Sequence, residues 1–283
     1  MTSAQERMTT DLDATDPLPR RAAPSGRPRP EARVEVAERL VSLLAPESFA
    51  ADQYRALRHS VEGLRKEAGL HVIAVTSPGP GDGKTVTTLN LAGALAQGPD
   101  VRVLVVDADL RRPSVAKYLG LGSPRSPGLV DALRDPAYKM DRAIRRLEQF
   151  NLSVLPAGLP QTAPYELLNS MRLESLLREA CGLYDFVIVD TPPLVPMPDS
   201  RLIRRSVGGF LVVVGAHKTR RKVLGHALTL LDPAKVIDLV FNGDDQPRAS
   251  HSGYYDYYSE RGIDRTRWWH ALLPRRGPDA PRW

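Results

Sequence analysis

Residues 71–96 read HVIAVTSPGPGDGKTVTTLNLAGALA: an apolar run, a loop of glycines and prolines, and an Ala/Leu-rich stretch. The segment GDGKT supplies the lysine and threonine that close a phosphate-binding loop. In such a loop, backbone N–H groups and the first turn of the following helix cradle phosphates. Glycines at positions 79, 81 and 83 let the backbone approach an anion closely. The order strand, loop, helix therefore predicts a nucleotide-binding site.

The loop also predicts which ligands bind. A lysine at this position reaches the β- and γ-phosphates, and the neighbouring hydroxyl binds Mg²⁺, so we expect ATP and Mg²⁺. The predicted nucleotide contacts are Gly79, Pro80, Gly81, Asp82, Gly83, Lys84, Thr85 and Val86. The strict pattern has glycine where this chain has Pro78, so the loop by itself could be a chance turn.

Two further apolar runs end in acidic residues. VRVLVVDADLRRP places Asp107 and Asp109 after one run, and YDFVIVDTPP places Asp190 after another. Ligands of parallel α/β sheets bind outside the carboxyl ends of the strands, where these carboxylates would meet the phosphate loop. We predict Lys84, Asp107 and Asp109 as catalytic residues, and we predict the metal ligands Thr85, Asp107, Asp109 and Asp190. Each acid alone could simply cap a strand end or a helix start.

Strand-like and helix-like stretches alternate along the chain. Apolar runs are expected to be strands at 71–77, 101–107, 152–158, 185–190, 209–215 and 236–243. Helical patterns are expected at 34–44, 48–69, 84–97, between 113 and 147, at 164–180 and at 219–231. Several strands are apolar on consecutive residues, as in a sheet covered on both faces. This predicts an α/β fold, a doubly wound and mostly parallel sheet flanked by helices.

Composition sets the domain organisation. Residues 1–33 are rich in Pro, Ala and Arg and are expected to be a disordered arm, 34–244 the nucleotide-binding domain, and 245–283 a flexible tail. A net charge of +6 is too modest to argue for nucleic acid, which is not expected as a partner. A single cysteine and the lack of a signal peptide or a 20-residue apolar run predict a cytoplasmic protein.

The segment GYYDYYSE, residues 253–260, holds four of the nine tyrosines: Tyr254, Tyr255, Tyr257 and Tyr258. The tyrosines do not alternate with period two, so a half-buried strand does not explain them. They could share one face of a helix, where an aromatic stripe usually serves packing. Their polar surroundings leave another use open.

With these motifs in place, residues 40–258 resemble the bacterial tyrosine kinases (BY-kinases) of capsular and exopolysaccharide export. SPGPGDGKT resembles their Walker A motif, LVVDADLRRP their A-prime motif, and FVIVDTPP their Walker B motif. LPAGLPQTAPYELLNS, PDSRLI and VIDLVFNG follow in the family's order. The resemblance implies an ATP-dependent autokinase that phosphorylates its C-terminal tyrosines, here the four in 253–260.

The resemblance also implies partners and residue roles. It implies a homo-oligomeric ring regulated by phosphorylation, and a membrane-embedded polysaccharide co-polymerase at the inner face of the cell membrane. DQYRALR is similar to the family's oligomerisation motif, with Asp52 in place of glutamate, and implies interface roles for Asp52, Arg55 and Arg58. Asp107 would be the base, and Asp109 and Asp190 would mainly hold the metal. Asn242 would read the adenine, although an Asn-Gly turn is an equal alternative.

Two other functions stay open. The chain could be an ATPase switch of the partition or division-site type that positions cargo or a membrane partner without transferring phosphate to tyrosine. Pro78 argues against this, because that sister group has a second lysine at this position. The chain could also be a non-catalytic regulatory subunit, which the intact Lys84, Asp107 and Asp190 disfavour.

Overall fold

The computed structural model describes residues 35–122, 126–195 and 199–243. The expected N-terminal arm (1–33) and the flexible tail (245–283), which contains the tyrosine segment, lie outside these residues, so their organisation stays a prediction. No helix in the described ranges is both long and apolar enough to cross a membrane.

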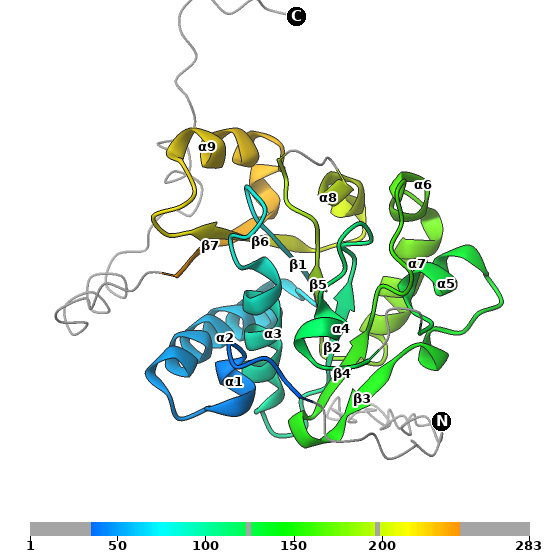
Figure 1. Ribbon diagram of the computed structural model, residues 1–283, viewed down its shortest axis with the longest axis horizontal. Coiled ribbons are helices and arrows are strands. Elements are labelled where there is room, and N and C mark those ends of the chain that lie inside the picture. Colours follow the sequence, from blue (N-terminus) through cyan, green and yellow to red (C-terminus); the bar gives the residue numbers. More distant parts are fainter. Residues whose placement is uncertain (1–34, 123–125, 196–198, 244–283) are drawn as a thin grey trace, which may run out of the picture. The chain divides into compact units, whose positions relative to one another are not determined.

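A seven-stranded sheet runs through the described residues in the order β3-β4-β2-β5-β1-β6-β7 (Figure 1). The strands are β1 Val72–Thr76, β2 Val103–Asp107, β3 Arg145–Leu147, β4 Leu152–Leu155, β5 Phe186–Asp190, β6 Gly209–Gly215 and β7 Val236–Asn242. All neighbouring pairs are parallel except β3 and β4. The predicted doubly wound, mostly parallel sheet is confirmed.

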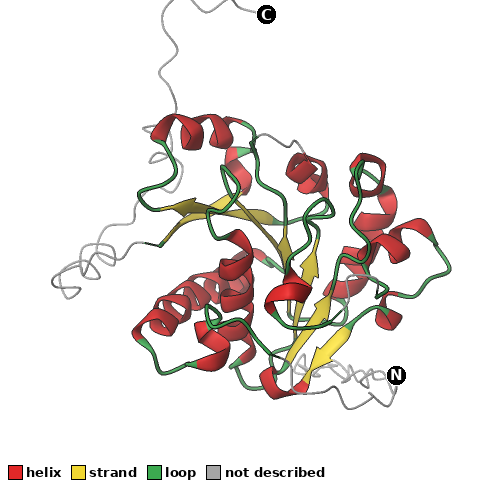
Figure 2. Cartoon of the chain, viewed as in Figure 1, coloured by secondary structure: helices red, strands yellow, loops and turns green. Residues whose placement is uncertain are grey.

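Helices cover both faces of the sheet, as Figure 2 shows. The longer α-helices are α2 Phe49–Ala68, α3 Lys84–Ala96, α5 Leu129–Arg134, α7 Met171–Cys181 and α9 Arg221–Thr229. One-turn α-helices are α1 Val41–Leu44, α4 Val115–Tyr118, α6 Tyr165–Leu168 and α8 Asp199–Leu202. Short 3₁₀ turns lie at Met140–Arg142, Glu148–Phe150, Ile203–Arg205 and Pro233–Lys235.

Two apolar cores lie on opposite faces of the sheet. Side chains of α2 and α3 pack on one face and those of α5, α7 and α9 on the other. Strands β1, β2 and β5 are buried at every position, which explains their continuous apolar sequence. Because both faces are covered, the free surface of the central strands is their carboxyl edge, where loops can build a site.

Local signals account for several helix ends. Helix α2 begins after Ser48, whose hydroxyl accepts the N–H of Ala51, and ends at Gly69, which has a left-handed backbone. The helix predicted over 164–180 is wrong as a single element. Ser170 accepts the N–H of Leu173 and starts α7 there, so α6 and α7 are separate helices.

Two other predictions of helices need correction. In the stretch predicted as a helix over 34–44, the described residues form helix only at Val41–Leu44. Earlier residues bond to the core instead: the N–H of Ala37 reaches the carbonyl of Tyr118 at 2.9 Å. Between 113 and 147, the last three residues form β3 rather than helix, because they pair antiparallel with β4 through a turn at Asn151 with positive φ.

Candidate active site

The phosphate loop joins β1 to α3 and is shaped by its own side chains. The carboxylate of Asp82 accepts the N–H of Gly79 at 2.9 Å, which bends the loop back on itself. Gly83, with φ of 96°, ends the loop, and a Cβ there would overlap the side chain of Asn242. A side chain at this position would therefore be strained by the backbone conformation and would displace the Asn242 amide.

Asn242 lies at the end of β7, beside this loop. Its amide nitrogen donates to the carbonyl of Asp82 at 3.0 Å, and Gly243 follows with φ of 75°. The amide thus contacts the phosphate loop, and the Asn-Gly pair also changes the chain direction. The sequence marked the residue but not this contact, and its role toward adenine stays a prediction.

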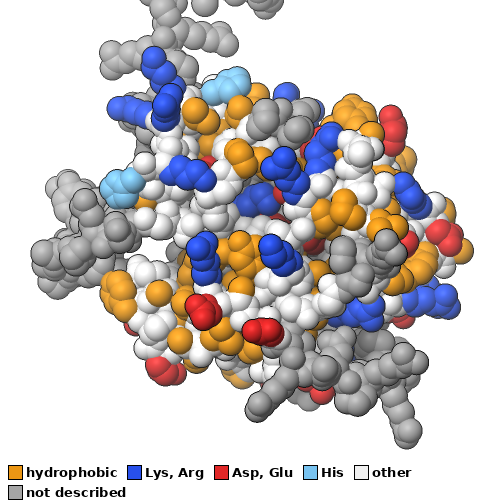
Figure 3. Space-filling model, viewed as in Figure 1, with side chains coloured by type: hydrophobic (Ala, Val, Ile, Leu, Met, Phe, Trp, Pro, Cys, Tyr) orange, Lys and Arg blue, Asp and Glu red, His pale blue; other side chains and the backbone are white. Residues whose placement is uncertain are grey.

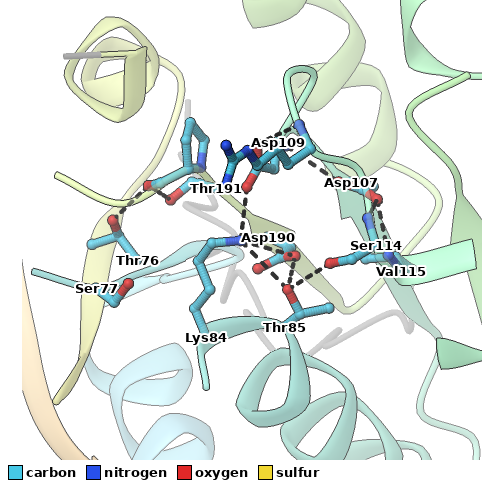
Figure 4. A network of polar contacts seen from close by, with 12 residues as sticks. Thr76, Ser77, Lys84, Thr85, Asp107, Asp109, Ser114, Val115, Asp190 and Thr191 are labelled. Atoms are coloured by element: carbon cyan, nitrogen blue, oxygen red, sulfur yellow. Dashed lines mark hydrogen bonds and ion pairs between the residues drawn. The ribbon is translucent and has the colours of Figure 1, made fainter. Parts of the chain in front are cut away.

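Lys84 extends from the first turn of α3 into a group of carboxylates (Figure 4). Its Nζ lies 2.9 Å from Oδ2 of Asp109 and 3.7 Å from Oδ2 of Asp190. Burial opposes the charge of Lys84, but the neighbouring Asp190 and Asp109 raise its pKa. The ammonium group is therefore charged and is held by the carboxylates of Asp109 and Asp190.

Thr85 follows Lys84 and faces Asp190 at the end of β5. Its hydroxyl donates to Oδ2 of Asp190 at 2.6 Å and lies 2.9 Å from the hydroxyl of Ser114. Burial raises the pKa of Asp190, while Lys84 and the Thr85 hydroxyl oppose that shift. A hydroxyl and a carboxylate with oxygens this close suit a hard cation. No sequence pattern marked Ser114.

Mg²⁺ fits this arrangement without a cage of protein ligands. Among the residues that the structure describes, no three His, Cys, Asp or Glu side chains form a group that could hold a metal. Mg²⁺ usually binds through one or two carboxylates together with substrate phosphates and water. The pair Thr85 and Asp190, next to the phosphate loop, meets that requirement.

Asp107 ends β2 and lies opposite Asp190 in the register of the two strands. It is fully buried, and its oxygens accept the backbone N–H groups of Asp109, Ser114 and Val115. Burial, followed by the charge of Asp190, raises the pKa of Asp107 to about 8. The carboxyl group anchors the loop that follows β2.

The raised pKa of Asp107 should make the stability of the protein depend on pH. Its pKa is about 8 in the folded chain and about 3.9 when unfolded, so between these values the folded chain holds the extra proton. Stability of the metal-free protein should therefore fall as pH rises through this window, by at most about 1.4 kcal/mol per pH unit from this group. Urea unfolding in EDTA at pH 5.5 and 7.5 measures the slope, which Asp107→Asn should flatten. A slope that is unchanged by Asp107→Asn would contradict the assignment.

The Thr-Pro-Pro turn after β5 is fixed to β1. The hydroxyl of Thr191 donates to the carbonyl of Val75 at 2.9 Å, and the hydroxyl of Thr76 donates to the carbonyl of Pro192 at 3.0 Å. Both threonines are fully buried. These bonds hold Asp190 rigidly at the carboxyl edge of the sheet.

Arg111 connects the loop after β2 to α8. Its guanidinium group lies 2.5 Å from a carboxylate oxygen of the buried Asp199 and donates to the carbonyl of Thr162 at 2.6 Å. Hydrogen bonding to Asp199 raises the pKa of Arg111. Both residues lie in segments that resemble family motifs, LVVDADLRRP and PDSRLI. Nothing in the sequence indicated that Arg111 and Asp199 pair across 88 positions.

The predicted oligomerisation residues lie on α2, away from this network. Asp52 and Arg55 form an ion pair on the same helix. Arg58 bonds to Glu62 at 2.7 Å and to the carbonyl of Ala94 on α3 at 2.9 Å. Within the described residues Arg58 therefore ties α2 to α3, and an interface role for these three residues stays a prediction.

A cavity of about 840 Å³ opens beside the phosphate loop. Its lining includes six predicted nucleotide contacts, Pro80, Gly81, Gly83, Lys84, Thr85 and Val86. Asp109 lines the same cavity, whereas Asp107 borders a second one of about 550 Å³. The structure thus brings Lys84, Thr85, Asp107, Asp109 and Asp190 together. The two acids of the DAD segment differ, because Asp109 lines the cavity beside the phosphate loop and Asp107 does not.

A phosphate loop between β1 and α3, with carboxylates at the ends of β2 and β5, defines the chain as a P-loop ATPase. A family model described as an AAA domain matches residues 70–202. The tyrosine-protein kinase YwqD of Bacillus subtilis is 32% identical over 218 residues, which cover 76% of this chain and 90% of that relative. The tyrosine-protein kinase ptk of Acinetobacter johnsonii is 31% identical over 87% of this chain, but only 34% of that relative is covered.

A solved structure agrees with these relatives. The kinase domain of the Escherichia coli tyrosine kinase ETK superimposes with a TM-score of 0.68 at 30% identity, covering 76% of this chain and 84% of that domain. The chain belongs to the bacterial tyrosine kinase family. The resemblance drawn from the motifs is confirmed.

Proposed function

We propose that the protein is an ATP-dependent tyrosine autokinase that transfers the γ-phosphate of ATP to tyrosines of its own C-terminal segment. The observation that carries this is the group of Lys84, Thr85, Asp109 and Asp190 around one cavity, in a chain of the tyrosine kinase family. The four tyrosines 254, 255, 257 and 258 are the proposed acceptors.

Positioning and charge neutralisation carry out most of a phosphoryl transfer. Mg²⁺, when bound, neutralises the phosphate oxygens, and Thr85 and Asp190 are the residues to hold it. The phosphate loop orients the triphosphate, and Lys84 moves from Asp109 to the β- and γ-oxygens. The phenol oxygen then forms a bond to the γ-phosphorus as the bond to the β–γ bridging oxygen breaks, and ADP leaves.

A carboxylate must accept the phenol proton. Family resemblance gives this role to Asp107, but its oxygens accept three backbone N–H groups, and the residue is fully buried. Asp109 lines the cavity, and its Oδ2 is paired with Lys84. When Lys84 turns to the phosphates, Asp109 is released within reach of the entering phenol. We therefore propose Asp109 as the base.

Mass spectrometry of the purified chain after incubation with Mg·ATP tests the function. We expect phosphate on tyrosines 254–258, none without Mg²⁺, and none when all four tyrosines are changed to phenylalanine. ATP hydrolysis without any phosphotyrosine would instead support the cargo-positioning switch. Neither hydrolysis nor phosphotyrosine would support the non-catalytic subunit.

Partners rest on the family alone. We propose self-association through α2, regulated by tail phosphorylation, and contact with a membrane-embedded polysaccharide co-polymerase that brings the chain to the inner face of the cell membrane. Each phosphate adds about −1.5 to −2 charges, so phosphates on neighbouring tyrosines should repel one another, and we expect a fully modified tail to leave the site. Light scattering on the same samples should show a larger species before phosphorylation than after it. Equal masses would exclude regulation of self-association by phosphorylation.

A further inference from the structure

The walls of the main cavity differ in their role. One wall is the phosphate loop with Lys84 and Thr85, and the others are segments 37–39, 111–118 and 192–193. Segment 37–39 is fixed in place, since Ala37 bonds to Tyr118 and the carbonyl of Arg39 accepts the side-chain amide of Asn90 at 3.0 Å. The cavity of about 840 Å³ therefore extends from the phosphate loop to these other segments.

Its lining is basic. Five basic side chains line the cavity, against the two acids Glu38 and Asp109. Two of the five are already paired, Lys84 with Asp109 and Arg111 with Asp199. The other three, Arg39, Arg112 and Lys117, are exposed, and no ion pair with an acid is found for them among the described residues. Lys and Arg side chains gather around the middle of the face shown in Figure 3.

The position of these three cations suits the acceptor rather than the nucleotide. Asn242 contacts the phosphate loop but does not line the cavity. If the base of ATP lies at Asn242, the cavity lies toward the γ-phosphate. The attacking and leaving oxygens must be roughly in line, so the phenol has to enter from the side opposite the ADP leaving group. The entry path is then the part of the cavity that the cations surround.

The acceptor segment has the complementary charge. Residues 253–260 contain Asp256 and Glu260 and no basic residue. Every one of the four tyrosines lies within two positions of Asp256, which is at most about 7 Å along an extended chain. Whichever tyrosine reaches the γ-phosphate, a carboxylate accompanies it at nearly the same distance.

We propose that Arg39, Arg112 and Lys117 form a carboxylate subsite that selects acceptor tyrosines with an acidic neighbour, and that its occupant is segment 253–260 of this chain or of a second copy. This inference rests on the proposed kinase function and adds its sequence preference. The same subsite would disfavour tyrosines flanked by lysine or arginine. Partly exposed pairs of this kind are weakened by salt.

Peptide kinetics with the full-length protein test the proposal. The acceptor peptide spans residues 251–260, and its matched control carries Asp256→Asn and Glu260→Gln. We expect KM for the neutral peptide to be about fivefold higher with kcat unchanged, and the difference to shrink in 0.5 M salt. This arm uses the unmodified enzyme, so it does not depend on whether a variant folds.

The enzyme arm uses Arg112→Met and Lys117→Met, with Lys139→Met as a control because Lys139 is exposed and does not line the cavity. The first two variants should raise KM for the acidic peptide but not for the neutral one, and KM for ATP should not change. Lys117→Arg keeps the positive charge, so its KM for the acidic peptide should equal that of the wild type. Either change removes the same ion pair. Combining an enzyme variant with the neutral peptide should therefore raise KM by less than the product of the two separate effects.

Each other outcome is informative. Equal KM values for the two peptides would overturn the subsite while leaving the kinase function intact. A rise in KM for ATP instead would assign the cations to the nucleotide and also overturn it. Failure to phosphorylate either peptide or the protein's own tail would overturn the proposed function on which the inference rests.

Discussion

Changing Lys84 to methionine should lower the rate of phosphotyrosine formation by at least about 100-fold. Removing one preorganised group that stabilises transition-state charge costs about this much in other enzymes. Lys84 is 11% exposed, and its Nζ lies 2.9 Å from Asp109, so it is desolvated and already directed into the site. Methionine keeps the length of the stem but removes the charge. The initial rate of phosphate incorporation into tyrosine, measured by mass spectrometry, gives the result.

Two controls separate chemistry from folding. Lys139→Met removes an exposed cation outside the cavity and should keep the wild-type rate. Lys84→Met leaves Asp109 and Asp190 without their cation, so thermal unfolding must show that the variant is folded at the assay temperature. Wild-type phosphorylation by a folded Lys84→Met protein would remove the whole site assignment.

Much of the site could be predicted from the sequence because the fold is parallel. Strands that read as continuous apolar runs must be buried on both faces, and the carboxyl ends of parallel strands meet at one edge. The sequence therefore predicts that the acids at the ends of β2 and β5 lie close together beside the phosphate loop. In the structure Asp107 and Asp190 are direct neighbours in the register.

The rest depended on contacts that no local pattern reveals. Arg111 and Asp199 pair across 88 positions, and nothing in either segment specifies the other. Ser114 reaches Thr85 only because Asp107 binds the backbone of the loop after β2. The sequence predicts helix for the residues of β3 because a three-residue edge strand is too short to show a period; its partner β4 determines its conformation.

The two acids of the DAD segment should respond differently to the same substitution. Asp109→Asn should lower kcat by about 100-fold or more, since a positioned general base contributes about 10²–10⁴. Nucleotide binding should persist or tighten, because Lys84 then loses a competing ion pair of 2.9 Å and is free to reach the phosphates. Steady-state rates and nucleotide binding, measured on the same preparation, report both effects.

Asp107→Asn should act mainly through the loop. An asparagine amide can turn its oxygen toward the N–H groups of Ser114 and Val115, which both donate at 3.0 Å to one carboxylate oxygen, but its nitrogen then faces the N–H of Asp109. This leaves one pair of buried donors facing each other, at about 1–3 kcal/mol, so we expect a lower melting temperature and a smaller loss of rate than for Asp109→Asn.

Magnesium distinguishes the remaining explanation. If Asp109 acted by holding Mg²⁺, a higher concentration of the metal would restore the rate of Asp109→Asn; a base cannot be replaced in this way. We expect no restoration. Should Asp109→Asn keep the wild-type rate while a folded Asp107→Asn protein is inactive, the proton acceptor is Asp107, as the family resemblance implied. In that case the loop after β2 must open during the reaction, because the structure leaves Asp107 fully buried.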